Sequence, residues 1–90
     1  MDETSIYKTV NHIESIIRGM EPLDTVDDDL LQEIKHMGIS SVQKYSNLCP
    51  VRDILSSLTA SKTPKEVRSR LVALSQTISL LRKVPLKECQ

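Results

Sequence analysis

The stretch TPKEVRSRLVALSQTISLL, residues 63–81, predicts a long helix with a well-marked start. Thr63 suits the N-cap, Pro64 suits the first helical position, and Glu66 can bond back toward the cap. Aliphatic residues then recur at steps of four and three: Val67, Leu71, Leu74, Ile78 and Leu81. Because they form one apolar stripe, we expect this helix to lie between other helices and to end before Pro85.

A first helix is predicted near the start of the chain. Its apolar stripe consists of Ile6, Val10, Ile13, Ile17 and Met20. We expect Thr4 or Ser5 to cap this helix, and Gly19 with Pro22 to end it.

A second helix is predicted from an acidic first turn at residues 27–29, with Thr25 as its cap. Its expected apolar residues are Val26, Leu30, Leu31, Ile34 and Met37. We expect Gly38 to end it.

Two further helices are expected between Gly38 and Thr63. Ser40 with Gln43 is consistent with a capping box that opens a short helix. Pro50 suits the first position of the next helix, and the polar run 59–62 is expected to break it. The apolar residues of these two helices are Val42, Tyr45, Val51, Ile54, Leu55 and Leu58.

These signals predict an all-α fold. We expect a compact five-helix bundle, four main helices and one short, as a single domain over residues 1–90 with an ordered core of about 5–84. Its expected core is Ile13, Ile17, Leu30, Ile34, Val51, Ile54, Leu58, Leu71, Leu74 and Ile78.

Composition excludes a membrane protein and a disordered chain. Hydrophobic residues make up 39% of the chain and charged residues 27%, and no apolar run approaches the roughly 20 residues that span a bilayer. The opening Met1-Asp2-Glu3 lacks the features of a secretory signal, so an intracellular protein is expected. Since Cys49 and Cys89 lie far apart in sequence, we expect no structural disulfide.

Catalysis and cofactor binding have almost no support in this sequence. Serines are plentiful, but none lies in a Gly-x-Ser-x-Gly turn, and two glycines make no phosphate-binding loop. His12 and His36 are expected at the surface without a metal. The acidic cluster formed by Asp24 and residues 27–29 is explained by a helix N-terminus better than by a metal loop. Cys49 before a helix is more consistent with a small buried residue than with a reactive thiol.

Charge is unevenly spread along a chain of zero net charge. Residues 1–61 hold ten acids and five bases, whereas residues 62–90 hold seven bases and two acids. Lys62, Lys65 and Arg68 are expected to form a basic edge, either a solvated helix face or a site for an acidic peptide. The small size of this patch, in a chain with only two aromatic residues, favours an acidic peptide over nucleic acid as the partner.

The predicted helices carry apolar residues in a characteristic order along the chain. The order is residues 30–40, then Val42, Tyr45, Val51 and Leu55, then Val67, Leu71, Leu74 and Ile78. It resembles the N-terminal domain of the elongation factor TFIIS, a small helical bundle also found in Elongin A, a Mediator subunit and Iws-type factors. The first helix and Leu23-Asp24 resemble the integrase-binding domain of lens epithelium-derived growth factor. The resemblance covers roughly residues 6–84, with Ile78 in place of a typical tryptophan.

This resemblance implies a nuclear scaffold protein that binds short disordered peptides of transcription-elongation or chromatin partners, and we expect it to be a monomer. The peptide would carry acidic residues and an apolar anchor, and would dock on two inter-helix loops. Asp24 would receive its backbone amides, and the basic edge would attract its acids. The implied site residues are Leu23, Asp24, Lys62, Thr63, Pro64, Lys65 and Arg68.

Two other functions stay open at the level of sequence. Residues 57–68 are similar to the last two helices of paramyxovirus phosphoprotein X domains, which bind a nucleoprotein helix in a groove between helices. Nucleic-acid binding by the basic last helix is the other, and it predicts a steep loss of affinity with salt. All three alternatives describe binding proteins and not enzymes.

Overall fold

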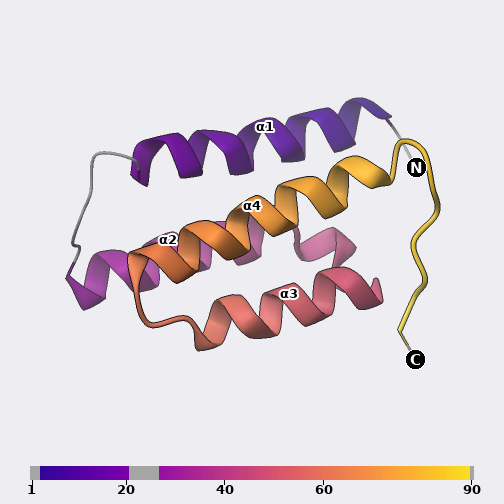
Figure 1. The fold of residues 1–90 in the computed structure, drawn as a ribbon. Coiled ribbons are helices and arrows are strands. Elements are labelled where there is room, and N and C mark those ends of the chain that lie inside the picture. The colour runs from indigo at the N-terminus through magenta and orange to yellow at the C-terminus, as the bar shows by residue number, and fades with distance from the viewer. Residues whose placement is uncertain (1–2, 21–26, 90) are drawn as a thin grey trace.

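The computed structural model describes residues 3–20 and 27–89, and these residues are almost entirely helical (Figure 1). The elements are α1 (Glu3–Met20), α2 (Asp28–Ser41), the 3-10 helix η1 (Gln43–Tyr45), α3 (Cys49–Ala60) and α4 (Pro64–Leu80). Over these two ranges the only strand-like pairing is an isolated antiparallel bridge between Leu48 and Glu88. The predicted all-α class, with four main helices and one short helix, is confirmed.

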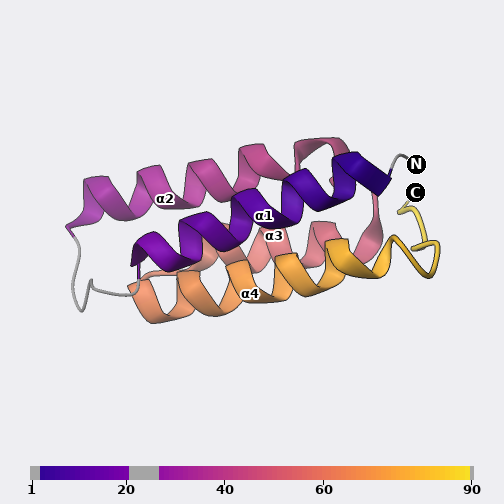
Figure 2. The ribbon, with the colours of Figure 1, turned by 90° about the horizontal axis from the view of Figure 1, so that it is seen from above.

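The four long helices run up and down in turn, with α4 at the centre (Figure 1). Helix α4 makes its most extensive contacts with α1 and α3. Seen from above, α1 lies between α2 and α4, with α3 beyond them (Figure 2). Because neighbours in sequence are antiparallel, one end of the bundle gathers the end of α1, the start of α2, the end of α3 and the start of α4.

The stripe predicted for α4 forms the centre of the core. Four of its members are 0% exposed: Val67, Leu71, Leu74 and Ile78. They pack with buried side chains of α1, α2 and α3 in one cluster. Leu81 follows the last residue of the helix and is only partly buried. The packing of α4 on both α1 and α3 explains why the four stripe residues inside the helix are enclosed.

Helix α1 differs from its prediction at both ends and on its buried face. It begins at Glu3, so Thr4 and Ser5 lie inside it, and it continues through Gly19. Its buried residues are Ile6, Thr9, Ile13, Ile16 and Met20, while Val10 and Ile17 are partly buried. Helical periodicity alone allows either the predicted or the observed set of residues to face the core. The contacts of α1 with α2 and α4 decide which set is buried. Pro22 lies outside the described residues.

Helix α2 is capped by Asp27, whose Oδ1 accepts a hydrogen bond from the Leu30 amide at 2.8 Å. Thr25 and Val26 lie outside the described residues. The prediction that Leu30 is a core residue is wrong, because 36% of it is exposed, and Met37 is 43% exposed. The helix turns Leu31 and Ile34 inward instead. Adjacent leucines cannot share one face of a helix, so packing selected Leu31.

Gly38 does not end α2, which continues to Ser41. No glycine among the described residues has a positive φ, so a left-handed cap is not its role. A Cβ placed on Gly38 would lie 2.6 Å from Cδ2 of Leu71 and 3.4 Å from Cδ2 of Leu58. Glycine at this position therefore lets α2 approach α3 and α4 closely.

The connection from α2 to α3 is tighter than predicted. Helix α2 continues through Ser40, and η1 follows at once, with the Tyr45 amide bonded to the Val42 carbonyl at 2.9 Å. Val42 and Tyr45 are buried as part of the core. Helix α3 begins at Cys49, one residue before the predicted start at Pro50, and buries Val51 and Leu58. Ile54 is only partly buried.

Cys49 and Cys89 form a disulfide, so the prediction of no structural disulfide is wrong. Their Cα atoms lie 4.8 Å apart, within the range that a disulfide requires. After α4 the chain turns back and reaches the start of α3, where the Cys49 amide donates to the Lys87 carbonyl at 2.9 Å. This return of the chain brings Cys89 beside Cys49, although 40 residues separate them in sequence.

Candidate functional site

The start of α4 is held by the cap predicted from the sequence. The Thr63 Oγ1 accepts a hydrogen bond from the Glu66 amide at 3.2 Å and lies 3.2 Å from Oε1 of the same residue. Pro64 is the first residue of the helix and is partly buried. Thr63 and Pro64 thus fix the start of α4, and with it the positions of the exposed residues Lys62 and Lys65.

Arg68 has a definite structural contact. Its Nη2 donates a hydrogen bond to the carbonyl of Met20 at 2.8 Å, across from α4 to the last residue of α1. A cation at the C-terminus of a helix satisfies a carbonyl that has no partner within the helix, and it is favoured by the helix dipole. Arg68 therefore joins α4 to α1, whereas Lys62 and Lys65 stay exposed to solvent.

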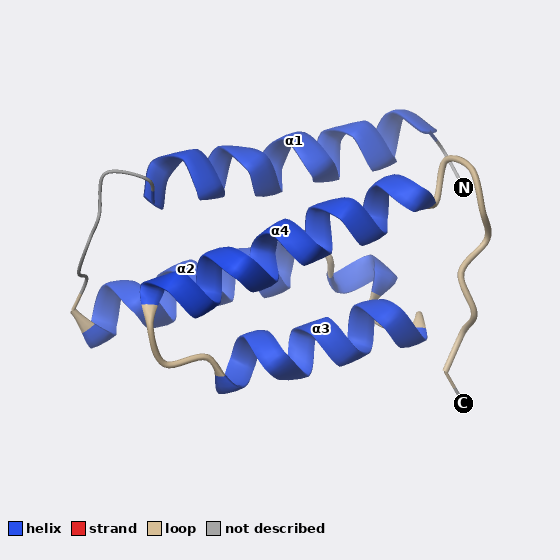
Figure 3. Ribbon diagram, viewed as in Figure 1, coloured by secondary structure: helices blue, strands red, loops and turns tan. Residues whose placement is uncertain are grey.

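The contact of Arg68 with Met20 is relevant to the two inter-helix loops on which, by the resemblance, a peptide would dock. Leu23 and Asp24 lie outside the described residues. Met20, however, is the last described residue before them, and Arg68 holds it beside the first turns of α4. The end of α1 and the start of α4 are therefore neighbours at one end of the bundle (Figure 3).

Lys35 is a buried charged residue that sequence reasoning missed. It is only 6% exposed, and its Nζ donates to the carbonyl of Thr59 at 3.2 Å, in the last turn of α3. It shares the stripe of Leu31, Ile34 and Gly38, so its position on an apolar face was the available signal. Like Arg68, it places a positive charge on the C-terminal turn of a neighbouring helix.

Both signs of charge are exposed at this end of the bundle. Lys62 and Lys65 flank the start of α4, and Asp28 and Asp29 occupy the first turn of α2. Beside them Leu30 leaves part of its side chain open. Such a surface would attract the acidic part of a ligand toward α4 and repel it from α2, which gives a preferred orientation.

Possible metal ligands do not cluster in the described part of the chain. Within residues 3–20 and 27–89, no three His, Cys, Asp or Glu side chains gather as metal ligands would. His12 and His36 are exposed, as predicted. The helices of the described part of the chain include none long and apolar enough to cross a membrane.

No family model, curated protein or solved structure matches this chain. The resemblance to the TFIIS N-terminal domain and to integrase-binding domains therefore stays a hypothesis carried by the residues quoted for it.

Proposed function

We propose that this domain is a non-catalytic interaction module that binds a short acidic peptide segment of a protein partner. The site is the end of the bundle where α1 ends and α4 begins. The observation that carries the proposal is the hydrogen bond from Arg68 to the Met20 carbonyl. It joins the end of α1 to the first turns of α4, which supports a surface at this end of the bundle that includes residues 62–65.

Charge and exposure give each residue of this surface a role. Lys62 and Lys65 are exposed, so they can attract carboxylates without breaking a contact of the fold. Leu30 offers apolar area for an anchor side chain of the peptide. Charged residues at the rim mainly set encounter rate and specificity, while a buried anchor supplies most of the affinity.

The partner class comes from the resemblance alone. We propose a disordered segment of a transcription-elongation or chromatin factor, recognised in the nucleus by a monomeric domain. Leu23 and Asp24 belong to this proposal as the residues that would receive the peptide backbone.

The proposal is tested by titrating isotope-labelled protein with an acidic peptide that carries phenylalanine anchors, while amide chemical shifts are recorded. We expect perturbations at residues 20–30 and 61–68. Shifts confined to a surface between α3 and α4 would instead favour the groove-binding mode of X domains. No shifts at millimolar peptide would refute the proposed site for this ligand class.

A matched pair of charge reversals separates the site from general electrostatics. Lys62→Glu should weaken peptide binding about tenfold and reduce its salt dependence, because a rim lysine is replaced by a repelling carboxylate. Lys8→Glu makes the same change in net charge on an exposed residue near the start of α1, at the opposite end of the bundle. Equal losses in the two variants would show that net charge, and not this surface, governs binding.

A further inference from the structure

Residues 82–89, here called the strap, return from the end of α4 to the start of α3 (Figures 1 and 3). The strap first turns tightly, with the Val84 amide bonded to the Leu80 carbonyl at 2.8 Å. It then passes through Pro85 and runs antiparallel to residues 47–49, where Leu48 and Glu88 form the isolated bridge. The strap lies at the end of the bundle opposite the proposed peptide site.

Few noncovalent contacts hold the strap in place. The Cys49 amide donates to the Lys87 carbonyl at 2.9 Å, and the Cys89 amide donates to the Asn47 carbonyl at 2.8 Å. Asn47 also bonds the Glu88 carboxylate at 3.2 Å in an exposed position. Leu86 packs on the core, and the Arg82 guanidinium at the start of the strap lies 4.5 Å from the centre of the Tyr7 ring of α1. Because hydrogen bonds near solvent contribute little net stability, the disulfide is the main attachment.

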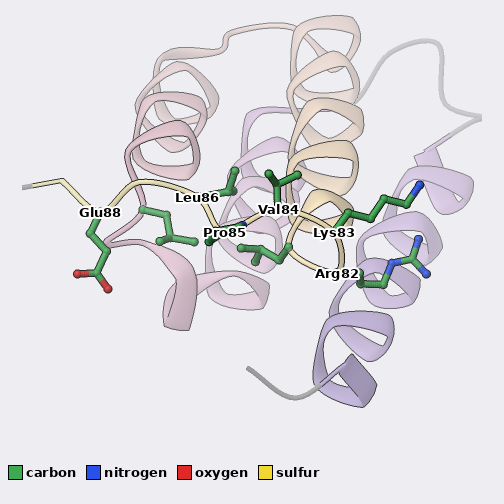
Figure 4. Close-up of a pocket in the computed structure, with 8 residues that line it drawn as sticks. Arg82, Lys83, Val84, Pro85, Leu86 and Glu88 are labelled. Atoms are coloured by element: carbon green, nitrogen blue, oxygen red, sulfur yellow. The ribbon is translucent and has the colours of Figure 1, made fainter.

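The strap also forms most of a pocket of about 350 Å³ (Figure 4). The walls of this pocket are Leu48, Leu81 and six strap residues. Leu48 is buried in the oxidised form. Detachment of the strap would therefore remove the pocket and expose Leu48 and Leu81 at the end of the core.

We propose that the Cys49–Cys89 disulfide is a reversible redox latch, which fastens the strap when oxidised and releases it when reduced by thiols. Both cysteines are partly exposed, so a small thiol such as glutathione or a dithiol can reach them. Cys49 is the first residue of α3, where the helix N-terminus stabilises a thiolate and makes its sulfur a good leaving group. This inference does not depend on the proposed peptide site.

Reduction of the disulfide by thiol–disulfide exchange takes two steps. A reductant thiolate attacks Sγ of Cys89, the S–S bond breaks, and Cys49 leaves as a thiolate that takes up a proton. A second reductant thiolate then attacks the sulfur of the reductant in the mixed disulfide and releases Cys89, which is also protonated. The protein gains two electrons and two protons, and two reductant thiols are oxidised to one disulfide. In a reducing compartment the strap is free, and under oxidation it is fastened.

The latch is tested by amide hydrogen exchange on the 90-residue chain, air-oxidised and then reduced with dithiothreitol, with free thiols counted by alkylation and mass spectrometry. On reduction, we expect two thiols per chain and an acceleration of about tenfold or more in exchange at the Cys49 and Cys89 amides. The Leu74 amide in α4 exchanges only through unfolding of the whole domain, so it should lose no more protection than the fall in global stability requires and stay far better protected than the Cys49 and Cys89 amides. The double variant Cys49→Ser/Cys89→Ser should behave like the reduced protein with or without dithiothreitol.

Three results would overturn the inference. Two free thiols in the air-oxidised chain would mean that the disulfide does not form. Unchanged exchange at Cys49 and Cys89 after full reduction would mean that the strap is held without it. Equal protection at Leu74, Cys49 and Cys89 after reduction would mean that the strap opens only when the whole domain unfolds, so the disulfide would be a staple of the fold and not a latch.

Discussion

Replacement of Gly38 by alanine tests the close packing of α2 against α3 and α4. Alanine in place of glycine inside a helix is favourable by about 1 kcal/mol when nothing obstructs the new methyl group. At Gly38 the methyl carbon would lie 2.6 Å from Cδ2 of Leu71, roughly 1 Å inside normal carbon contact. Leu71 is fully buried, so it can move only by displacing its neighbours.

The two effects oppose each other, and packing should win. Overpacking a well-filled core costs about 1–3 kcal/mol, which exceeds the gain in helix propensity. We therefore expect Gly38→Ala to lower the free energy of unfolding by about 1 kcal/mol, a fall in Tm of about 4–8 °C for a domain of this size.

Gly19 provides the matched control. It also lies inside a helix, yet a Cβ placed on it would meet no atom within 4 Å. Gly19→Ala should therefore stabilise the protein, by about 0.5 kcal/mol because it lies in the last turn of α1. Both variants are compared with the parent by thermal and urea unfolding, followed by circular dichroism.

A second substitution isolates the contact itself. Leu71→Val removes the δ carbons that a methyl on Gly38 would strike, so Gly38→Ala should cost less in that background. We expect a coupling of about 1 kcal/mol in the double-mutant cycle. If Gly38→Ala raises Tm as much as Gly19→Ala does, the close approach of α2 to Leu71 is wrong.

Three further stability predictions follow from the core, the cap and the disulfide. Leu74→Ala should lower the free energy of unfolding by about 2–5 kcal/mol in urea denaturation, because Leu74 is fully buried, whereas Leu80→Ala at a half-exposed position should cost less than about 1 kcal/mol. Thr63→Ala should cost about 1 kcal/mol by loss of the N-cap bond, and Thr63→Ser should retain most of the stability; an equal loss in both would exclude the cap as the cause. Reduction of Cys49–Cys89 should lower Tm and remove about 2–4 kcal/mol, as expected for a closed loop of this length, and an unchanged Tm after complete reduction would contradict it.

Only part of the candidate site could be predicted from sequence signals between neighbouring residues. The cap at Thr63 and the exposed positions of Lys62 and Lys65 followed from the order of residues around the start of α4. The contact of Arg68 with Met20 did not, because it joins residues 48 positions apart. Nothing in the spacing of Arg68 distinguishes a residue that binds a helix end from one that faces solvent.

The sequence by itself determined the all-α class, the number of helices and the buried stripe of α4, because capping, proline placement and helical periodicity act between residues a few positions apart. Only the tertiary structure decided which leucine of the pair Leu30-Leu31 is buried, why position 38 is a glycine, and that Cys49 meets Cys89. Each of these depends on how distant helices and the strap approach one another. Periodicity narrows the buried face of a helix to a broad sector, and the neighbours that pack against it select the side chains within that sector.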